Sequence, residues 1–152
     1  MKPNLALTVQ YAIKPPGIPT RHQFRKWVLA ALNTYAEITV RIVDAEEGQS
    51  LNRDYRAKDY PTNVLTFPLN DEPLMGDIVL CAPVVEKEAR EQNKSLEAHY
   101  AHLTIHGVLH LQGYDHENEQ DAEEMEAIET QIITNLGYAD PYHILENAIT
   151  HG

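Results

Sequence analysis

The sequence predicts an α+β fold with α/β-like character, in which a small mixed sheet of about four strands packs with about five helices. Three observations support this prediction. Segments with alternating apolar residues and segments with helical periodicity follow one another in the order βαβαββααα. A length of 152 residues suits one core, so residues 1–152 are expected to form a single domain. No stretch approaches the roughly 20 apolar residues of a membrane span.

The first part of the chain predicts two strands and two helices. Alternation indicates one strand through Leu5, Leu7, Val9 and Tyr11, and a second through Ile38, Val40 and Ile42. Between them, Thr20 can cap a helix. The apolar face of that helix would consist of Phe24, Trp27, Val28 and Ala31. A short helix through Leu51 and Tyr55 is expected next.

Two β-rich runs follow, at residues 63–67 and 77–81. Their proximity predicts an antiparallel hairpin with residues 68–76 as its loop. Pro83 suits the first turn of the next helix, because proline lacks an amide hydrogen that the first turn does not need. Asn63 and Asp77 are better candidates for turn, cap or strand-end roles than for a cleft.

The helix that follows is the central one. Ser95 can cap it, and from Ala98 to Leu111 it is apolar on nearly all sides, which is typical of a buried helix. Burying an unpaired imidazole costs on the order of 1 to 3 kcal/mol. Its histidines therefore need partners, and for His102 a backbone group or a carboxylate is expected.

The last helix places apolar residues on one face and acids largely elsewhere. Its apolar face would be Met125, Ile128, Ile132 and Leu136, and Gly137 would end it. Glu123, Glu124, Glu126 and Glu129 are interpreted as a solvated face.

A metal site is expected at the end of the central helix. His106 and His110 are four residues apart, so both rings lie on one face about a turn apart and can reach one ion. Gly113 can end the helix in the left-handed conformation and turn the chain so that His116 approaches the same ion. Three protein ligands leave a fourth position for water or substrate, as catalytic zinc requires. Because Cys81 is the only cysteine, a thiolate cage is excluded.

The residue after the first histidine argues against a peptidase. Zincin proteases carry His-Glu-x-x-His, and their glutamate is the general base that activates water. Here that position is Gly107. The proton acceptor of the protease mechanism is missing although the metal pattern is present.

The net charge of −11 is unevenly distributed. Residues 1–58 carry nine Lys and Arg against five acids, whereas residues 95–152 carry eleven acids and no Lys or Arg. A phosphate-bearing partner is expected to approach the basic side formed by Arg21, Arg25, Lys26, Arg53, Arg56 and Lys58. The N-terminus has no apolar h-region, so a cytoplasmic location is expected.

Three segments resemble one known family. The run from His106 to His116, HGVLHLQGYDH, is similar to the signature HGxLHLxGYDH of the YbeY family of bacterial endoribonucleases. Residues 51–68, LNRDYRAKDYPTNVLTFP, and residues 76–81, GDIVLC, resemble two further stretches of that family. The likeness covers essentially the whole chain, and Thr66 stands where the family often has serine.

The resemblance implies a single-strand-specific, metal-dependent endoribonuclease acting in 16S rRNA 3′-end maturation, rRNA processing and 70S ribosome quality control. It implies ribosomal RNA and the ribosome or ribosome-associated proteins as partners, with no membrane and no DNA specificity. By the same match His106, His110 and His116 would ligate one Zn²⁺, and Arg56 and His110 would be catalytic.

Several alternatives stay open. The protein could be a zincin-like metallohydrolase acting on peptide or amide substrates, or a non-catalytic ribosome-assembly factor with a structural metal. Arg56 could form only a surface ion pair. Asp115 could orient a ligand or merely stabilise its own turn. The general base could be a hydroxide on the metal, Asp115 or the RNA 2′-hydroxyl. Zinc is preferred, but three histidines also bind nickel or copper, and the oligomeric state is undetermined.

Overall fold

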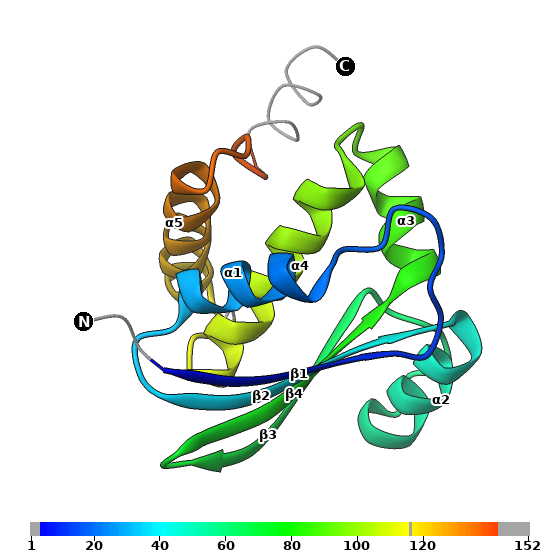
Figure 1. Ribbon diagram of the computed structural model, residues 1–152, viewed down its shortest axis with the longest axis horizontal. Helices are drawn as coiled ribbons and strands as arrows, with labels where there is room; N and C mark the ends of the chain where they lie inside the picture. The colour runs from blue at the N-terminus through cyan, green and yellow to red at the C-terminus, as the bar shows by residue number, and fades with distance from the viewer. Residues whose placement is uncertain (1–3, 116, 143–152) are drawn as a thin grey trace.

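The computed structural model describes residues 4–115 and 117–142. In this part of the chain, four strands and five helices follow one another in the predicted order (Figure 1). They are β1 (Leu5–Tyr11), α1 (Arg21–Ala31), β2 (Ala36–Val43), α2 (Ala45–Arg56), β3 (Val64–Asp71), β4 (Leu74–Cys81), α3 (Ala82–Glu91), α4 (Leu96–Leu111) and α5 (Glu119–Asn135). The predicted α+β class is confirmed. None of the described helices is long and apolar enough to cross a bilayer.

The sheet is mixed, with the strand order β1-β2-β4-β3. β1 pairs with β2 in parallel, and β2 pairs in parallel with β4, in a register that aligns Val9 with Val40 and Val40 with Ile78. β3 is antiparallel to β4 and lies at the edge of the sheet. The predicted hairpin is therefore confirmed.

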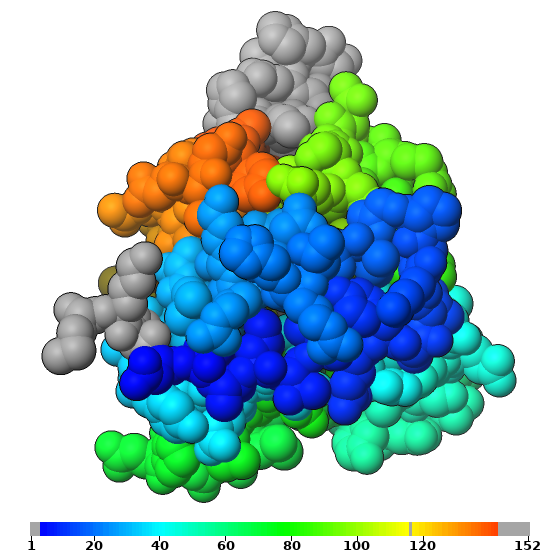
Figure 2. Space-filling view, viewed as in Figure 1, coloured from blue at the N-terminus to red at the C-terminus, as the bar shows by residue number. Residues whose placement is uncertain are grey.

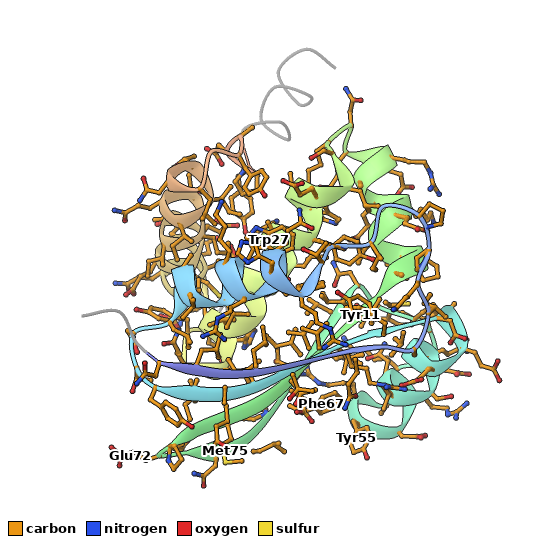
Figure 3. All side chains as sticks on the ribbon, viewed as in Figure 1. Tyr11, Trp27, Tyr55, Phe67, Glu72 and Met75 are labelled. Carbon is orange, nitrogen blue, oxygen red and sulfur yellow. The ribbon has the colours of Figure 1, made fainter. Side chains whose placement is uncertain are left out.

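Each face of the sheet has its own apolar layer, because successive strand residues point to opposite sides. Ile78 and Leu80 belong to the main core beneath α1 and α4, whereas Val79 and Cys81 belong to a smaller cluster covered by α2. Figure 1 shows α1, α4 and α5 on one side of the sheet and α2 on the other. On the α2 side the rings of Tyr55 and Phe67 meet edge to face, 5.2 Å apart (Figure 3).

The helices begin where their caps were predicted. Thr20 and Gln23 form a reciprocal capping box at the start of α1, and the Ser95 hydroxyl accepts the Ala98 amide at the start of α4. Pro83 lies in the first turn of α3.

On one face of the molecule, β1, the connector after it and α1 form a continuous outer surface (Figure 2).

α4 is buried in the main core, as its sequence predicts. Ten of its residues are buried, on several sides of the helix. On the α1 side it packs against Phe24 and Trp27, with the Phe24 ring edge-on to Tyr100. At its C-terminal end Leu111 fills the space beside Gly76 of β4.

The predicted loop at residues 68–76 is wrong. β3 continues to Asp71 and β4 starts at Leu74, so the strands are joined by a tight turn at their tip. The run contains Pro68 and several polar residues, which are more typical of loops than of strands. Proline is tolerated on an edge strand, where its missing amide removes no ladder bond to a neighbour. The register shift between Pro68 and Asn70 absorbs the irregularity. Asp77 consequently lies inside β4 and not at its end.

The predicted apolar face of α5 packs against the main core, but the predicted solvated face is wrong at Glu129. Its fully buried residues are Met125, Glu129 and Ile133, whereas Ile128 and Ile132 are only partly buried. The buried stripe is thus rotated relative to the predicted one. Glu129 lies in the middle of this stripe, although the sequence analysis placed it in a solvated face.

Candidate metal centre

Four histidines form a continuous row along one face of α4. His99, His102, His106 and His110 follow one another at spacings of three or four residues, which keeps their side chains on one side of a helix. Successive ring centroids are 6.4, 6.5 and 5.3 Å apart. The row runs from the buried N-terminal part of α4 towards its C-terminal end.

His106 and His110 are the closest pair in this row. Their ring planes are inclined by 69°, and both residues are half-buried. The spacing of four residues therefore brings the two imidazoles side by side, as the sequence indicates. Their role as metal ligands stays a prediction, because among the described residues no group of three His, Cys, Asp or Glu side chains comes together in a metal-binding arrangement. The third predicted ligand, His116, lies outside the described residues.

The chain turns immediately after these histidines. Gly113 has a φ of 101°, its amide donates to the carbonyl of His110, and the Tyr114 amide donates to the carbonyl of Leu109. This pair of bonds is a Schellman motif, in which glycine takes the left-handed conformation. The predicted helix end at Gly113 is confirmed, and Tyr114 packs back against the main core.

Glu129 of α5 reaches His106 from the side. Its Oε1 accepts a hydrogen bond from Nδ1 of His106 at 2.5 Å, and its side chain is fully buried. An ionised carboxylate can only accept, so the hydrogen is on Nδ1 of the imidazole. In the neutral ring, Nε2 is then the nitrogen without a hydrogen, and a metal ion binds a histidine through such a nitrogen.

The carboxylate of Glu129 has two further neighbours. The Tyr142 hydroxyl donates to its Oε2, and Nε2 of His102 lies 3.6 Å from the same oxygen. Burial alone would raise the pKa of Glu129, but its polar interactions with His102 and His106 outweigh burial and lower that pKa to about 2. Glu129 is therefore ionised at neutral pH. The carboxylate expected near His102 is this one, and burial lowers the pKa of His102.

A second polar cluster lies at the other end of the row. Nε2 of His99 donates to Glu88 of α3 at 2.9 Å, and the Asn63 amide donates to the same carboxylate at 3.0 Å. The Asn63 carbonyl also accepts the amide of Val64, where β3 begins. Burial raises the pKa of Glu88, but the hydrogen bonds from His99 and Asn63 leave it below its ordinary value. This cluster ties α3, α4 and the start of β3 together, and Asn63 has the strand-end role predicted for it.

Arg56 lies apart from the histidines. It is the last residue of α2, on the opposite side of the sheet from α4, and its side chain is exposed. Across the described residues no hydrogen bond or ion pair involves that side chain, so the alternative of a surface ion pair is not observed. By contrast, Arg53 lies close to Asp54 and Asp59.

The single basic side predicted from the sequence does not form. Arg21, Arg25 and Lys26 belong to α1, on the α4 side of the sheet, whereas Arg53 and Arg56 belong to α2 on the other side. The physical reason is that α1 and α2, although they are consecutive helices, pack on opposite faces of the sheet. A phosphate-bearing partner therefore meets two separate basic surfaces.

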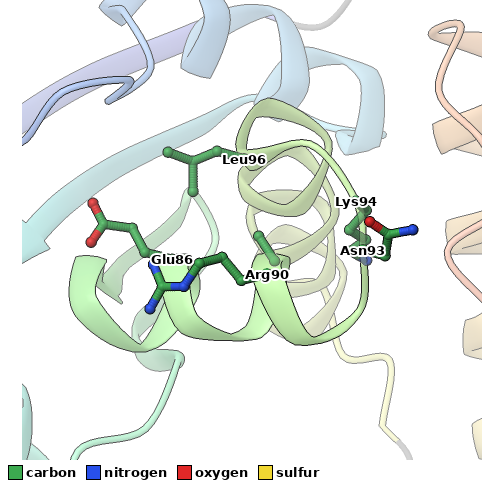
Figure 4. A pocket seen from close by; sticks show the side chains of 6 residues that line it. Glu86, Arg90, Asn93, Lys94 and Leu96 are labelled. Atoms are coloured by element: carbon green, nitrogen blue, oxygen red, sulfur yellow. The ribbon is translucent and has the colours of Figure 1, made fainter.

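Surface hollows lie next to both ends of α4. One, of about 230 Å³, lies beside the helix end and is lined by Gly113, Tyr114, Asp115, Asp121 and Glu124. The other, of about 310 Å³, lies where α3 turns into α4 and is lined by Glu86, Arg90 and Lys94 among others (Figure 4). The first adjoins the predicted metal-binding turn, whereas the second is at the far end of the helix.

Glu129 is the site residue that the sequence analysis missed. It is four residues after Met125 and four before Ile133, which are both fully buried. A single acid in the middle of an i, i+4 apolar stripe is a signal for a buried, paired carboxylate. Tyr142 was also missed, and no local pattern identifies it.

Comparisons with known proteins show which family the chain is similar to. The family model described as Endoribonuclease YbeY matches residues 18–137. Endoribonuclease YbeY of Methylobacillus flagellatus is 63% identical over 141 residues, covering 92% of this chain and 95% of that protein. The protein of the same name from Delftia acidovorans is 68% identical over 146 residues, covering 91% and 96%. A solution structure of a Thermotoga maritima protein, 27% identical, matches with a TM-score of 0.60 and covers 97% of this chain and 95% of that one.

Proposed function

The chain belongs to the YbeY family of endoribonucleases, and we propose that it cuts RNA with the help of one zinc ion held by His106, His110 and His116. As a member of that family it is a hydrolase acting on RNA phosphodiester bonds. The ligand set and the identity of the metal belong to the proposal.

The strongest support for the metal proposal is the hydrogen bond between His106 and Glu129. The hydrogen bond from Nδ1 of His106 to Glu129 makes Nε2 the ring nitrogen that carries the lone pair, and this ring lies beside the ring of His110. Histidines that bind metals commonly donate their other ring hydrogen to a carboxylate in this way. The described residues therefore fit a zinc ion, and His116 is the third ligand in this proposal.

Zinc bound by three histidines would supply a positive charge that polarises a phosphate oxygen and lowers the pKa of a water molecule. The rest of the chemistry falls to the chain's own residues. Arg56, at the end of α2, presents a planar fork of donors that has no partner among the described residues, and such a fork suits a phosphate group of the RNA. In this proposal Arg56 and His110 are the catalytic residues, and Asp115 remains a candidate base.

The two alternative functions receive less support. The relatives reported above are named endoribonucleases, and the position of a zincin base is occupied by Gly107, which is buried on the side of α4 that faces the sheet. A purely structural metal would require a fourth ligand from the protein. Three histidines leave a position for water or substrate.

We further propose that the substrate is single-stranded ribosomal RNA, and that the protein acts in the cytoplasm in 16S rRNA 3′-end maturation, rRNA processing and ribosome quality control. The ribosome and its associated proteins would be its partners, without a membrane or a preference for DNA. This assignment rests on family membership and on the two basic surfaces available for phosphates.

The decisive experiment measures zinc content and cleavage of a 16S precursor RNA on the same preparations. The variants are His110→Ala and, as a matched control, His22→Ala, which removes an exposed histidine of α1. We expect the first to lose both zinc and cleavage and the second to keep both. Loss of zinc with unchanged cleavage would reject the proposed metal-dependent mechanism.

A further inference from the structure

Glu129 occupies a position that an apolar residue would fill more simply. It is fully buried between Met125 and Ile133 in the stripe of α5 that faces the core. Burying an ionised carboxylate is unfavourable unless partners compensate for the lost water. The compensation here comes from outside α5, through His106 and Tyr142.

The two carboxylate oxygens of Glu129 have different partners. Oε1 accepts from Nδ1 of His106, and Oε2 accepts from the Tyr142 hydroxyl and lies near Nε2 of His102. Because both oxygens are engaged from different directions, the carboxylate cannot rotate without losing a bond. Its orientation, and through it the plane of the His106 ring, is set by partners from α4 and by Tyr142.

We propose that Glu129 is the positioning residue of the metal centre: it holds His106 as the Nδ1–H tautomer with Nε2 directed to the ion, and Tyr142 holds Glu129. This inference rests on the proposed function, since it requires that His106 be a metal ligand. In this inference Glu129 acts through His106 and is not itself a metal ligand.

A charge at this position has a direct consequence for the ligand. A carboxylate that accepts the Nδ1 hydrogen makes the imidazole more basic at Nε2, which strengthens its bond to a metal. A neutral amide of the same shape can accept through its oxygen or donate through its nitrogen, so it no longer selects one tautomer. Tight binding of the ion thus depends on the charge of residue 129 as well as on its size.

The first test needs no variant. The nitrogen chemical shifts of His106 in metal-free wild-type protein, from two-bond ¹H–¹⁵N correlation spectra, report which nitrogen carries the hydrogen. We expect the Nδ1–H form at a pH where the ring is neutral. Observation of the Nε2–H form would overturn the proposal.

The second test measures zinc affinity by competition with a chromophoric chelator. Glu129→Gln is expected to bind zinc about 10- to 100-fold more weakly, which is the usual effect of removing such an outer partner. The control is Glu123→Gln, which removes an exposed acid of the same helix and is expected to leave the affinity unchanged. Equal affinity in Glu129→Gln and wild type would refute the positioning role.

Two further variants complete the test. His110→Ala shows whether the site itself is correctly assigned. If both His110→Ala and Glu129→Gln bind zinc as tightly as wild type, the proposed metal site is wrong. If His110→Ala loses zinc but Glu129→Gln binds it as tightly as wild type, only the positioning role of Glu129 is wrong. Tyr142→Phe removes one bond to Glu129 without burying an unpaired charge, and we expect a smaller loss of affinity in the same direction. An affinity equal to that of wild type would remove Tyr142 from the proposal.

Discussion

Gly107 of α4 lies directly against Ile78 of β4. A Cβ atom at position 107 would come within 3.1 Å of Ile78 Cγ2, 3.2 Å of Cδ1 and 3.3 Å of Cγ1. The helix therefore packs as close to the sheet as its backbone allows. The absence of a zincin glutamate has a steric reason in addition to its chemical consequence, because a side chain at this position would point into the core.

Substitution of Gly107 by alanine is expected to destabilise the protein by up to about 2 kcal/mol. Overpacking of a core lowers the free energy of unfolding by about 1 to 3 kcal/mol. The higher helix propensity of alanine offsets about 1 kcal/mol of this loss. Urea unfolding of wild type, Gly107→Ala, Ile78→Val and the double variant measures the effect. Valine lacks the Cδ1 atom and leaves more room for a Cβ atom at position 107. Ile78→Val should therefore lower the free energy of unfolding by at least about 0.5 kcal/mol less in Gly107→Ala than in wild type. Additive costs would contradict the contact.

Zinc is expected to stabilise the folded protein through His110. At a free zinc concentration about 100 times the Kd, binding adds about 2.7 kcal/mol to the free energy of unfolding. For a chain of this length that corresponds to a rise in Tm of about 5 to 10 °C. The rise should vanish in His110→Ala and persist in His22→Ala. A similar rise in all three proteins would place the stabilising zinc elsewhere.

The cluster around Glu88 predicts a pH-dependent contribution to stability. The groups facing Glu88 are His99, Asn63 and Lys94, and they lower its pKa in the folded protein below the ordinary 4.5. A lowered pKa means that the ionised form is favoured by folding. The contribution of ionised Glu88 to the free energy of unfolding is therefore present above pH 4.5, and it is lost as the pH falls through the pKa of Glu88 in the folded protein.

The measurement compares the free energy of unfolding of wild type and Glu88→Gln between about pH 7 and about pH 3. Wild type should be the more stable protein near pH 7, and the difference should shrink below pH 4.5. Glu91→Gln, an exposed acid at the end of the same helix, is the control and should show no comparable change. A difference that grows on acidification would show that the sign is wrong.

Replacement of Arg56 by alanine is expected to lower the rate of RNA cleavage about 100-fold or more, the typical cost of losing a donor that stabilises transition-state charge. The fold should not change, because the side chain is exposed at the end of α2. Arg53→Ala, three residues earlier on the same helix, should have a smaller effect since Arg53 already has Asp54 and Asp59 nearby. If Arg56→Ala cleaves RNA as fast as wild type, Arg56 has no catalytic role and is an ordinary surface residue.

The chemical nature of the RNA ends distinguishes the open alternatives for the nucleophile. Attack by water leaves a linear phosphate, whereas attack by the RNA 2′-hydroxyl leaves a 2′,3′-cyclic phosphate. We expect linear ends from the wild-type protein, because a three-histidine site leaves room for water. Mass spectrometry of the cleavage products identifies them, and cyclic ends would exclude attack by water.

Much of the fold could be predicted because the relevant signals are local. The caps at Thr20 and Ser95, the buried character of α4 and the turn at Gly113 depend on residues no more than about one helical turn apart. The hairpin was predicted, but its tip was not. Whether Pro68 breaks a strand depends on its position at the edge of the sheet, which the local sequence does not specify.

By itself, the sequence determined the order and type of the elements and placed His106 and His110 on one face of a buried helix. Only the tertiary structure decided that Glu129, 23 residues further on, contacts His106, and that Arg56 and the basic residues of α1 lie on opposite sides of the sheet. The physical reason is that helix periodicity sets the direction of a side chain within its own element. The partner that it meets depends on how the elements pack, and that depends on the apolar faces of the whole chain together.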